Sequence, residues 1–299
     1  MSIQGKPPLT VGIVGLGLIG ASLAAGLRAR NVDITIIGSD RSDETTAKAK
    51  GRGLIDAIVD DPQAICAQAD VLVLAVPVLS TTEVLGLLAP HLADGTTVLT
   101  DVGSVKGSLI KSVKDVFGEL PTWLVPGHPI AGAERSGVDA ADPDLFDRHQ
   151  VILTPHEHSD IAAIETVTSL WRAVGADIQL MTVERHDEVL AATSHLPHLL
   201  AFSLVDTLAQ ESEKYEIFHY AAGGFRDFTR IAASDPTMWH DIFLSNDAAT
   251  LNVLDHYISH LEGLRTALRE RDGETLKQVF IRAKRARDYF SSILEERSR

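Results

Sequence analysis

A strand–turn–helix signature near the N-terminus places the strongest constraint on the fold. Val11–Val14 is a short apolar run with β-branched residues, which is typical of a buried parallel strand. Gly15, Gly17 and Gly20 follow with the spacing G-x-G-x-x-G, and Ala21–Arg30 has a helical pattern. In such a turn the first glycine permits a sharp bend, the second lets backbone approach a pyrophosphate, and the third lets the helix pack closely on the strand. The helix N-terminus then presents free N–H groups and the positive end of its dipole to phosphates.

An acidic residue stands at the distance that a dinucleotide site requires. Ile34–Gly38 has the pattern of a second strand, and Asp40 follows it, 20 residues after Gly20. A carboxylate at this point accepts hydrogen bonds from a ribose diol and repels a 2′-phosphate, which favours NAD over NADP. The adjacent Arg41 weakens this preference, because arginine pairs with phosphate. The alternative is a glycine-rich turn that binds nothing, but it does not account for the strand, the helix and the acid together.

Strand and helix patterns alternate after this unit, as a doubly wound parallel sheet requires. We expect further strands at 71–77, 97–100, 123–126, 151–154 and 177–181, with helices at 43–52, 80–92, 107–117 and 161–174. Strand patterns end near residue 183, and helical patterns follow at 186–208, 236–271 and 273–296. Pro197 lies inside the first of these and should kink or split it.

This order of elements predicts two domains. We expect an α/β Rossmann-type doubly wound domain over residues 1–183 and an all-α domain over residues 184–299. The helical domain is small and its helices carry apolar stripes, so it would complete its core against a second copy. We therefore expect a homodimer.

The composition indicates a globular protein of the cytoplasm. A chain of 299 residues with 45% hydrophobic and 23% charged residues can form two domains with cores. The net charge of −14 argues against nucleic acid and acidic membranes as partners. The apolar run 11–27 contains five glycines and follows little basic charge, which argues against an export signal, and no other stretch is a charge-free membrane span. Cys66 is the single cysteine, which excludes an intramolecular disulfide and fits a reducing compartment.

Four segments place unusual polar groups beside glycine or proline. A dehydrogenase that oxidises an alcohol needs a base near neutral pH, for which histidine is the usual choice, and a donor that orients it. It also needs cations for an acidic substrate, and arginine binds carboxylates in a bidentate manner. The segments that supply these groups are Asp101–Lys106, Gly127–Glu134, Ser194–His198 and Gly223–Arg230.

Each candidate also has a structural explanation. His128 could be a loop histidine held by a backbone hydrogen bond, and Ser104 could cap the helix that follows it. His195 and His198 could bind a metal, but no carboxylate or cysteine accompanies them at metal-ligand spacing, so we predict no metal. The arginines of the fourth segment could pair with nearby aspartates, namely Arg226 or Arg230 with Asp227 or Asp235.

Five motifs occur along the chain in a distinctive order. They are Gly15–Gly20, Asp101–Lys106, Gly127–Gly132, Ser194–His198 and Gly224–Ala232. Together they resemble the prephenate/arogenate (cyclohexadienyl) dehydrogenase family of tyrosine biosynthesis, over nearly the whole chain. The resemblance implies a Rossmann-type domain followed by a helical dimerisation domain. It also implies NAD-dependent oxidative decarboxylation of a cyclohexadienol, either prephenate or arogenate or both.

The resemblance implies roles for individual residues. His128 corresponds to the histidine that accepts the proton of the ring C4 hydroxyl, and Ser104 to the serine that hydrogen-bonds both this histidine and the hydroxyl. Arg230 corresponds to the arginine that holds a substrate carboxylate. Trp239 corresponds to a tryptophan that approaches the pocket from the partner subunit. The other positions expected near the substrate are Ser194, His195, His198, Glu134 and Asp227, and those expected near NAD are Gly15, Gly17, Leu18, Ile19, Gly20, Asp40, Val76, Pro77 and Asp101.

Two other interpretations compete with this one. A β-hydroxyacid dehydrogenase has a similar first domain but relies on a lysine of its helical domain, and no lysine occurs here between Lys114 and Lys214. A non-catalytic NAD-sensing protein would keep the glycines and Asp40 but has no need of the histidine, serine and arginine together. We expect neither a chorismate mutase extension before the first strand nor an ACT-type regulatory domain after the last helix. Prephenate and arogenate differ only in a keto or an amino group, and both remain candidate substrates.

Overall fold

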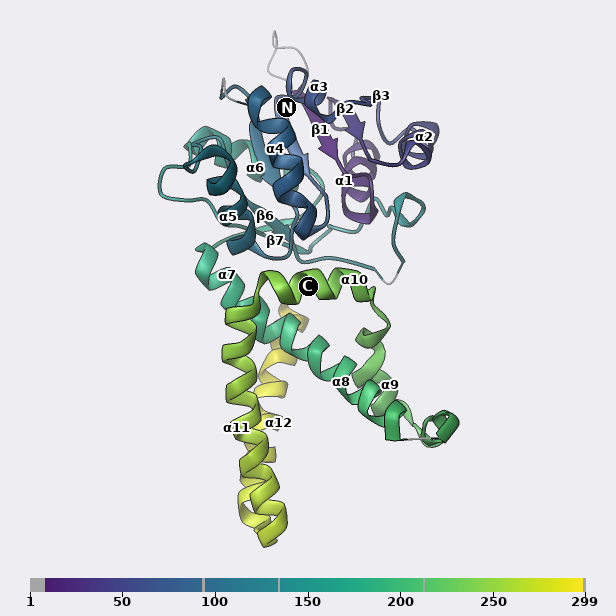
Figure 1. Ribbon diagram of the computed structural model, residues 1–299, viewed down its shortest axis with the longest axis vertical. Helices are drawn as coiled ribbons and strands as arrows, with labels where there is room; N and C mark the ends of the chain where they lie inside the picture. The colour runs from purple at the N-terminus through teal and green to yellow at the C-terminus, as the bar shows by residue number, and fades with distance from the viewer. Residues whose placement is uncertain (1–8, 93–94, 134, 212, 298–299) are drawn as a thin grey trace. The chain divides into compact units, whose positions relative to one another are not determined.

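The first part of the chain folds around a five-stranded parallel sheet. The computed structural model describes residues 9–92, 95–133, 135–211 and 213–297 (Figure 1). The strand order is β3-β2-β1-β4-β5, and neighbouring strands are parallel, as the sequence predicts. Chain order reverses beside β1, which is where open sheets of this kind bind their ligands. The strands are β1 (Leu9–Val14), β2 (Ile34–Ser39), β3 (Ala57–Ile58), β4 (Val71–Leu74) and β5 (Val98–Asp101).

Helices cover both faces of this sheet, because successive side chains of a strand point to opposite sides. Val71 and Val73 of β4 belong to one apolar core together with α1 (Leu18–Ala29) and α6 (Ile161–Ala173). Leu72 and Leu74 belong to a second core with α4 (Thr81–Leu92) and α5 (Lys106–Phe117). The remaining helices of this part are α2 (Asp43–Gly51) and α3 (Pro62–Cys66), and Cys66 is a buried core residue.

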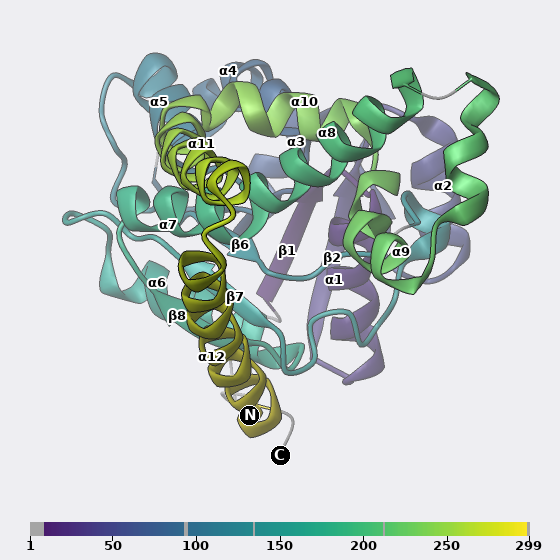
Figure 2. The ribbon, with the colours of Figure 1, turned by 90° about the horizontal axis from the view of Figure 1, so that it is seen from below.

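A second, three-stranded sheet follows and corrects one sequence prediction. It consists of β6 (Gly127–Pro129), β7 (Gln150–Leu153) and β8 (Asp177–Leu180), with β6 antiparallel and β8 parallel to β7 (Figure 2). The strand expected at 123–126 is only an isolated bridge between Leu99 and Leu124. Pro126 lacks an N–H and so cannot continue the ladder. The chain therefore leaves the first sheet there and forms β6 in the segment that we expected to be a loop.

One long helical segment comes after the sheets. The helix α7 (Val183–Leu190), a π-helical turn (Ala191–His195) and α8 (Leu196–Glu211) run on without interruption. We expected Pro197 to kink or split the helix. Instead the helix continues past the proline, and it widens into a π turn just before it. A π turn accommodates backbone groups that the missing N–H of proline leaves without their usual partner. By length and composition alone, Val183–Glu211 also qualifies as a membrane span.

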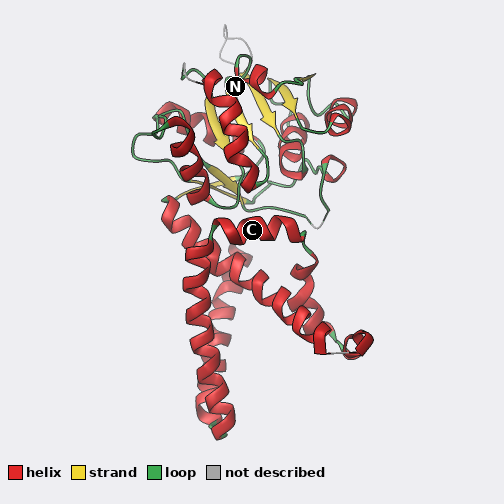
Figure 3. Ribbon diagram, viewed as in Figure 1, coloured by secondary structure: helices red, strands yellow, loops and turns green. Residues whose placement is uncertain are grey.

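The rest of the chain is helical (Figure 3). The single helix expected at 236–271 ends at Ser245 and begins again at Asp247, with Asn246 between the two. By compactness the chain divides into Met1–Asp247 and Ala248–Arg299. The predicted domain boundary at residue 183 coincides with the change from strands to helices and remains a prediction. The helices are α9 (Gly223–Thr229), α10 (Pro236–Ser245), α11 (Asp247–Glu270) and α12 (Gly273–Arg297), with 3-10 turns that include Glu213–Tyr220 and Arg230–Ala233.

Candidate active site

The glycine turn after β1 has the geometry of a pyrophosphate cradle. Gly15 has a φ of +97°, and a Cβ there would lie 2.3 Å from the carbonyl oxygen of Ala75. A Cβ at Gly20 would lie 2.1 Å from the carbonyl oxygen of Gly15, so α1 can approach the strand only with glycine at this position. A Cβ at Gly17 would meet nothing within 4 Å, which leaves the space that a phosphate group needs. No side chain caps the N-terminus of α1, so Leu18 and Ile19 in its first turn offer backbone N–H groups to a ligand.

Asp40 lies directly beside this turn. One carboxylate oxygen accepts a hydrogen bond from the Leu16 N–H at 2.8 Å, and the other accepts one from the Ser42 N–H at 3.0 Å. The carboxylate is only partly buried, and each oxygen has a further lone pair for a ribose hydroxyl. Arg41 is exposed beside it. Val76 and Pro77 follow β4, the strand on the other side of β1, so the expected cofactor contacts surround the point where chain order reverses.

Asp101 has a structural function that the sequence did not indicate. Its side chain is buried, and it accepts hydrogen bonds from the Gly103 N–H at 2.8 Å and from the Gly127 N–H at 3.0 Å. The ammonium of Lys106, which is fully buried, forms an ion pair with the same carboxylate and donates to the carbonyl oxygen of Gly127 at 2.6 Å. Burial lowers the pKa of Lys106, and the neighbouring carboxylates Asp101 and Asp187 oppose that shift. All three of these donors come from the protein, and the expectation that Asp101 contacts the cofactor stays a prediction.

The Asp101–Lys106 pair holds β6 against the end of β5, and this places His128. The Nδ1 atom of His128 lies 2.9 Å from Nε2 of His186, and Nδ1 of His186 lies 2.7 Å from a carboxylate oxygen of Asp187. Burial lowers the pKa of His128 well below 6.5, and the nearby His186, Lys106 and His195 lower it further. A histidine of this kind is neutral at neutral pH and can accept a proton.

Asp187 also caps α5, although the two are far apart in sequence. Its two carboxylate oxygens accept hydrogen bonds from the backbone N–H groups of Lys106 at 2.9 Å and Gly107 at 2.7 Å. Burial by itself would raise the pKa of Asp187, but the hydrogen bonds from His186, Lys106 and Gly107 outweigh it, and the pKa is lowered. The sequence analysis missed both His186 and Asp187. The only signal was an acid near the start of the helical pattern at 186–208, which is a common pattern on protein surfaces.

Ser104 does not cap α5, so that alternative is wrong. The N-cap residue is Val105, and the capping side chain is that of Asp187. The hydrogen bond expected between Ser104 and His128 is also not formed in the described part of the chain, where His128 is bonded to His186. Ser104 is partly exposed at the carboxyl end of β5, within the same segment as the Asp101–Lys106 pair.

A second cluster of histidines lies beyond His128. The side-chain amide of Asn246 donates to the backbone carbonyl of Asp187 at 3.0 Å and lies 3.1 Å from Nδ1 of His195. Because the carbonyl requires a donor, the atom near His195 is the amide nitrogen, so Nδ1 of His195 accepts and Nε2 carries the proton. Burial lowers the pKa of His195 to about 4; the charge of Asp187 opposes this shift, and His186 and His198 add to it. His195 is therefore a neutral N–H donor at neutral pH.

Trp239 lies in the middle of this cluster. Its ring stacks on the ring of His198 with 3.7 Å between centroids, and its centroid lies 6.1 Å from that of His195. Trp239 is buried against residues of its own chain, which include Val105. The expectation that this tryptophan approaches the pocket of a partner subunit stays a prediction. Its indole nitrogen is buried and has no hydrogen-bond partner among the described residues.

The cluster extends to Arg230. The Nδ1 atom of His198 donates to the carbonyl oxygen of Ser194 at 2.8 Å. Burial lowers the pKa of His198, the bond to Ser194 opposes this, and the charge of Arg230 lowers it further. Arg230 thus lies within electrostatic range of His198, on the 3-10 turn after α9. The structure brings His128, His195, His198 and Arg230 into one continuous series of neighbours.

The last two expected residues are less informative. Asp227 is exposed and pairs with Arg226 at 3.2 Å, which is the surface pairing considered as an alternative. Glu134 lies outside the described residues.

Two family models match the chain. The nucleotide-binding domain of prephenate dehydrogenase matches residues 23–180, and the dimerization domain of prephenate dehydrogenase matches residues 182–282. The chain belongs to the prephenate dehydrogenase family. The first match begins after the glycine turn, whereas the second includes His186, Asp187, His195 and Arg230.

Individual family members are similar over almost the whole chain. The cyclohexadienyl dehydrogenase of Zymomonas mobilis is 42% identical over 280 residues, which are 93% of this chain and 94% of that protein. A solved prephenate dehydrogenase from A. aeolicus, in complex with hydroxyphenyl propionate and NAD+, is 36% identical with a TM-score of 0.85, covering 95% of this chain and all of that one. The Synechocystis arogenate dehydrogenase is 31% identical with a TM-score of 0.80, covering 94% and 100%. The names of these three relatives give different substrates, namely a cyclohexadienyl compound, prephenate and arogenate.

Proposed function

We propose that this member of the prephenate dehydrogenase family is an NAD-dependent dehydrogenase of tyrosine biosynthesis. It oxidises and decarboxylates prephenate, arogenate or both. The observation that carries the proposal is the position of His128, a neutral histidine on β6 beside the carboxyl end of β5. Its Nδ1 atom is hydrogen-bonded to Nε2 of His186. Residues 1–183 bind the nucleotide, and residues 184–299 contribute the substrate groups.

The residues of the glycine turn fit NAD. The open space at Gly17 takes the pyrophosphate, the free end of α1 faces its charge, and Asp40 accepts the ribose hydroxyls. When bound, the nicotinamide takes up a hydride from ring carbon C4 of the substrate. The partly buried Val76 and the exposed Pro77 are the expected contacts on the β4 side.

His128 is the general base and returns the proton later. The ring nitrogen that does not face His186 accepts the proton of the C4 hydroxyl, and C4 becomes a carbonyl carbon. The bond from C1 to its carboxylate then breaks, CO2 leaves, and the electron pair enters the ring, which becomes aromatic. The oxygen on C4 takes the proton back from His128, so the histidine is neutral again and the reaction releases no net proton.

The second cluster recognises the ends of the substrate. Arg230 holds a substrate carboxylate by charge and hydrogen bonds. Nε2–H of His195 and the buried indole N–H of Trp239 are donors without another partner among the described residues, and they suit carboxylate or carbonyl oxygens. Because the net charge is −14, such local donors and cations are needed to attract an anionic substrate.

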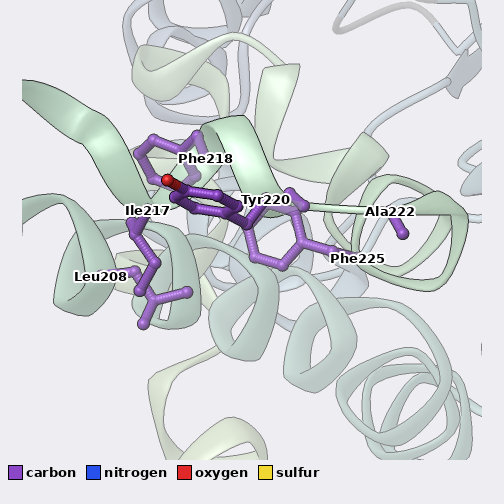
Figure 4. Close-up of a pocket in the computed structure, with 7 residues that line it drawn as sticks. Leu208, Ile217, Phe218, Tyr220, Ala222 and Phe225 are labelled. Carbon is purple, nitrogen blue, oxygen red and sulfur yellow. The ribbon is translucent and has the colours of Figure 1, made fainter.

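We also propose a homodimer in a reducing compartment. Residues 182–282 match a dimerization domain. Among the described residues of α11 and α12, large apolar side chains are exposed by 42–70%, and these are Leu251, Ile258, Leu261, Leu268, Phe280, Tyr289, Phe290 and Leu294. A monomer rarely leaves so many apolar groups in water. Separately, an apolar pocket between α8 and α9 is lined by Leu208, Ile217, Phe218, Tyr220, Ala222 and Phe225 (Figure 4).

The function is tested by adding NAD with prephenate or with arogenate and recording nicotinamide absorbance. We expect turnover with at least one of them, and the ratio of their kcat/KM values identifies the preferred substrate. His128→Asn should lower kcat by about 10²–10⁴-fold with little change in NAD affinity. The exposed histidine variant His91→Asn is the control and should behave as the native protein does. Normal turnover by His128→Asn would remove His128 from the base role.

A further inference from the structure

We propose that His186 and Asp187 are positioning residues for His128, which fix its tautomer so that Nε2 carries the lone pair that faces the substrate. The inference rests on the proposed function for its kinetic consequences, but the tautomer itself can be measured without substrate.

The argument starts at Asp187, which is an acceptor only. Its oxygens accept two backbone N–H groups at the N-terminus of α5, at 2.9 and 2.7 Å, where the helix dipole also favours negative charge. These bonds fix the carboxylate in place before any histidine is considered. Gly107 contributes to this arrangement, since a Cβ there would lie 2.7 Å from the nearer oxygen of Asp187.

The ionised carboxylate determines the protonation of both histidines. Nδ1 of His186 lies 2.7 Å from Asp187 and must donate, because a carboxylate cannot. A neutral His186 then has its lone pair on Nε2, which lies 2.9 Å from Nδ1 of His128. That pair can form a hydrogen bond only if His128 is protonated at Nδ1. Its Nε2 is therefore free of a proton and available to the substrate hydroxyl.

The same line of groups stabilises His128 after it accepts a proton. The imidazolium of His128 would be close to Lys106, His186 and His195, all of which disfavour a positive charge there. Asp101 balances Lys106, which leaves Asp187 as the carboxylate on the side of His186. His186 is fully buried, so the interaction between the carboxylate and His128 passes through a ring rather than through water.

Asp187→Asn is the decisive variant. An asparagine has one acceptor oxygen for three donors, because Oδ1 of Asp187 accepts from the Lys106 N–H and from Nδ1 of His186, and Oδ2 accepts from the Gly107 N–H. With its NH2 group in the Oδ1 position it faces Nδ1 of His186 and reverses the tautomers, and in either orientation the negative charge that opposes the proton on His128 is lost. In a serine-protease triad the equivalent change lowers kcat by about 10⁴-fold. We expect a fall of about 10²–10⁴-fold in kcat here, with substrate KM and NAD Kd within about threefold. Loss of the negative charge should also lower the pKa of His128, so that kcat/KM falls at a lower pH than in the native protein.

Two variants of His186 separate positioning from bulk packing. His186→Gln can accept from Nδ1–H of His128 and donate to Asp187, so it should keep the tautomer and retain kcat within about tenfold of the native value. His186→Leu offers no partner and should lose as much as Asp187→Asn. Equal losses for glutamine and leucine would contradict the proposal.

Controls distinguish a specific effect from loss of a helix cap. Asp160 caps α6 by accepting from the Ala162 N–H at 2.9 Å and is exposed, so Asp160→Asn makes the same chemical change at another cap. It should leave kcat and the pH profile unaltered. Gly107→Ala should displace the carboxylate and lower kcat, while the higher helix propensity of alanine offsets part of the stability that is lost with the cap.

Nitrogen-15 NMR of the histidine rings measures the tautomer of His128 directly and needs no substrate. We expect His128 to be protonated at Nδ1 in the native protein and at Nε2 in His186→Leu, which removes the acceptor that faces Nδ1 of His128. The same tautomer in both proteins would overturn the inference, whatever the substrate is. The expected tautomers together with no turnover of prephenate or arogenate would instead refute the proposed function alone.

Discussion

Replacing Gly17 by alanine should weaken cofactor binding, whereas replacing Gly20 by alanine should lower the stability of the fold. The two glycines belong to one turn and receive the same methyl group, yet the structure predicts different consequences. At Gly17 the new Cβ meets nothing within 4 Å of protein, and the residue has an ordinary φ of −69°. At Gly20 the Cβ would lie 2.1 Å from the carbonyl oxygen of Gly15, 3.0 Å from Ile13 and 3.1 Å from Ala75.

The magnitudes follow from these distances. Gly17→Ala is an N-cap change that costs a few tenths of a kcal/mol and is offset by reduced freedom of the unfolded chain, so unfolding should change by less than about 0.5 kcal/mol. Its methyl group occupies the pyrophosphate space and should weaken NAD binding by about 10–100-fold. Gly20→Ala must move α1 away from β1 by roughly 1 Å, which costs about 2–3 kcal/mol of overpacking after the gain in helix propensity. The thermal midpoint should fall by about 5–10 °C.

Calorimetric titration with NAD and a thermal melt of each variant measure these effects. If Gly17→Ala binds NAD normally, the turn does not face the pyrophosphate. If Gly20→Ala melts with the native protein, the close approach of α1 and β1 does not constrain the fold. Either result would refute the reasoning at that glycine without affecting the other.

Four further predictions concern the substrate, the cofactor and the effects of pH on activity and on stability. Arg230→Ala should raise the substrate KM by a factor that corresponds to about 2–4 kcal/mol while NAD Kd stays the same, and an unchanged KM would exclude the arginine as the carboxylate clamp. Asp40→Ala should narrow or reverse the preference for NAD over NADP, as the ratio of kcat/KM for the two cofactors will show. The kcat/KM for the substrate should be constant at neutral pH and fall only well below pH 6.5, because His128 must be neutral and its pKa is lowered. His195, with a pKa of about 4, binds its proton more readily in the unfolded chain, so stability should fall by about 3 kcal/mol as pH drops from 6.5 to 4, which denaturant titration at each pH can test.

Local patterns predicted the strand, the glycine turn and the helix of the candidate nucleotide site, all of which the structure contains. The strand, the three glycines and Asp40 lie close together in sequence, and each has a backbone requirement that residue type reveals. The same reasoning did not reveal the structural role of Asp101. A buried acid after a strand looks like a ligand contact, but its donors Gly127 and Lys106 lie 26 and 5 residues away and complete its coordination.

The network behind His128 could not be predicted because it depends on tertiary contacts. His128 and His186 are 58 residues apart, and Asp187 and Lys106 are 81 residues apart. No periodicity connects such residues, although His186 and Asp187 lie on a helical segment that was predicted. The resemblance to the family also pointed to Ser104 as the partner of His128 and to Trp239 as a residue of the other subunit. In the structure Nδ1 of His128 is hydrogen-bonded to Nε2 of His186, and the ring of Trp239 stacks on that of His198 in its own chain.

The buried ion pair of Lys106 and Asp101 restricts how this sequence can evolve. An ammonium that is sealed from water cannot lose its counter-ion, nor can the carboxylate lose its ammonium, without leaving a charge in the interior at a cost of about 3–5 kcal/mol. Either position should therefore reject nearly all single substitutions in a library screen, while a neutral pair such as Asp101→Asn with Lys106→Met should be recovered far more often than the product of its separate frequencies. Evolution from the charged pair to a neutral pair therefore passes through a single mutant that folds poorly. Laboratory evolution of the family would do best to change both codons at once.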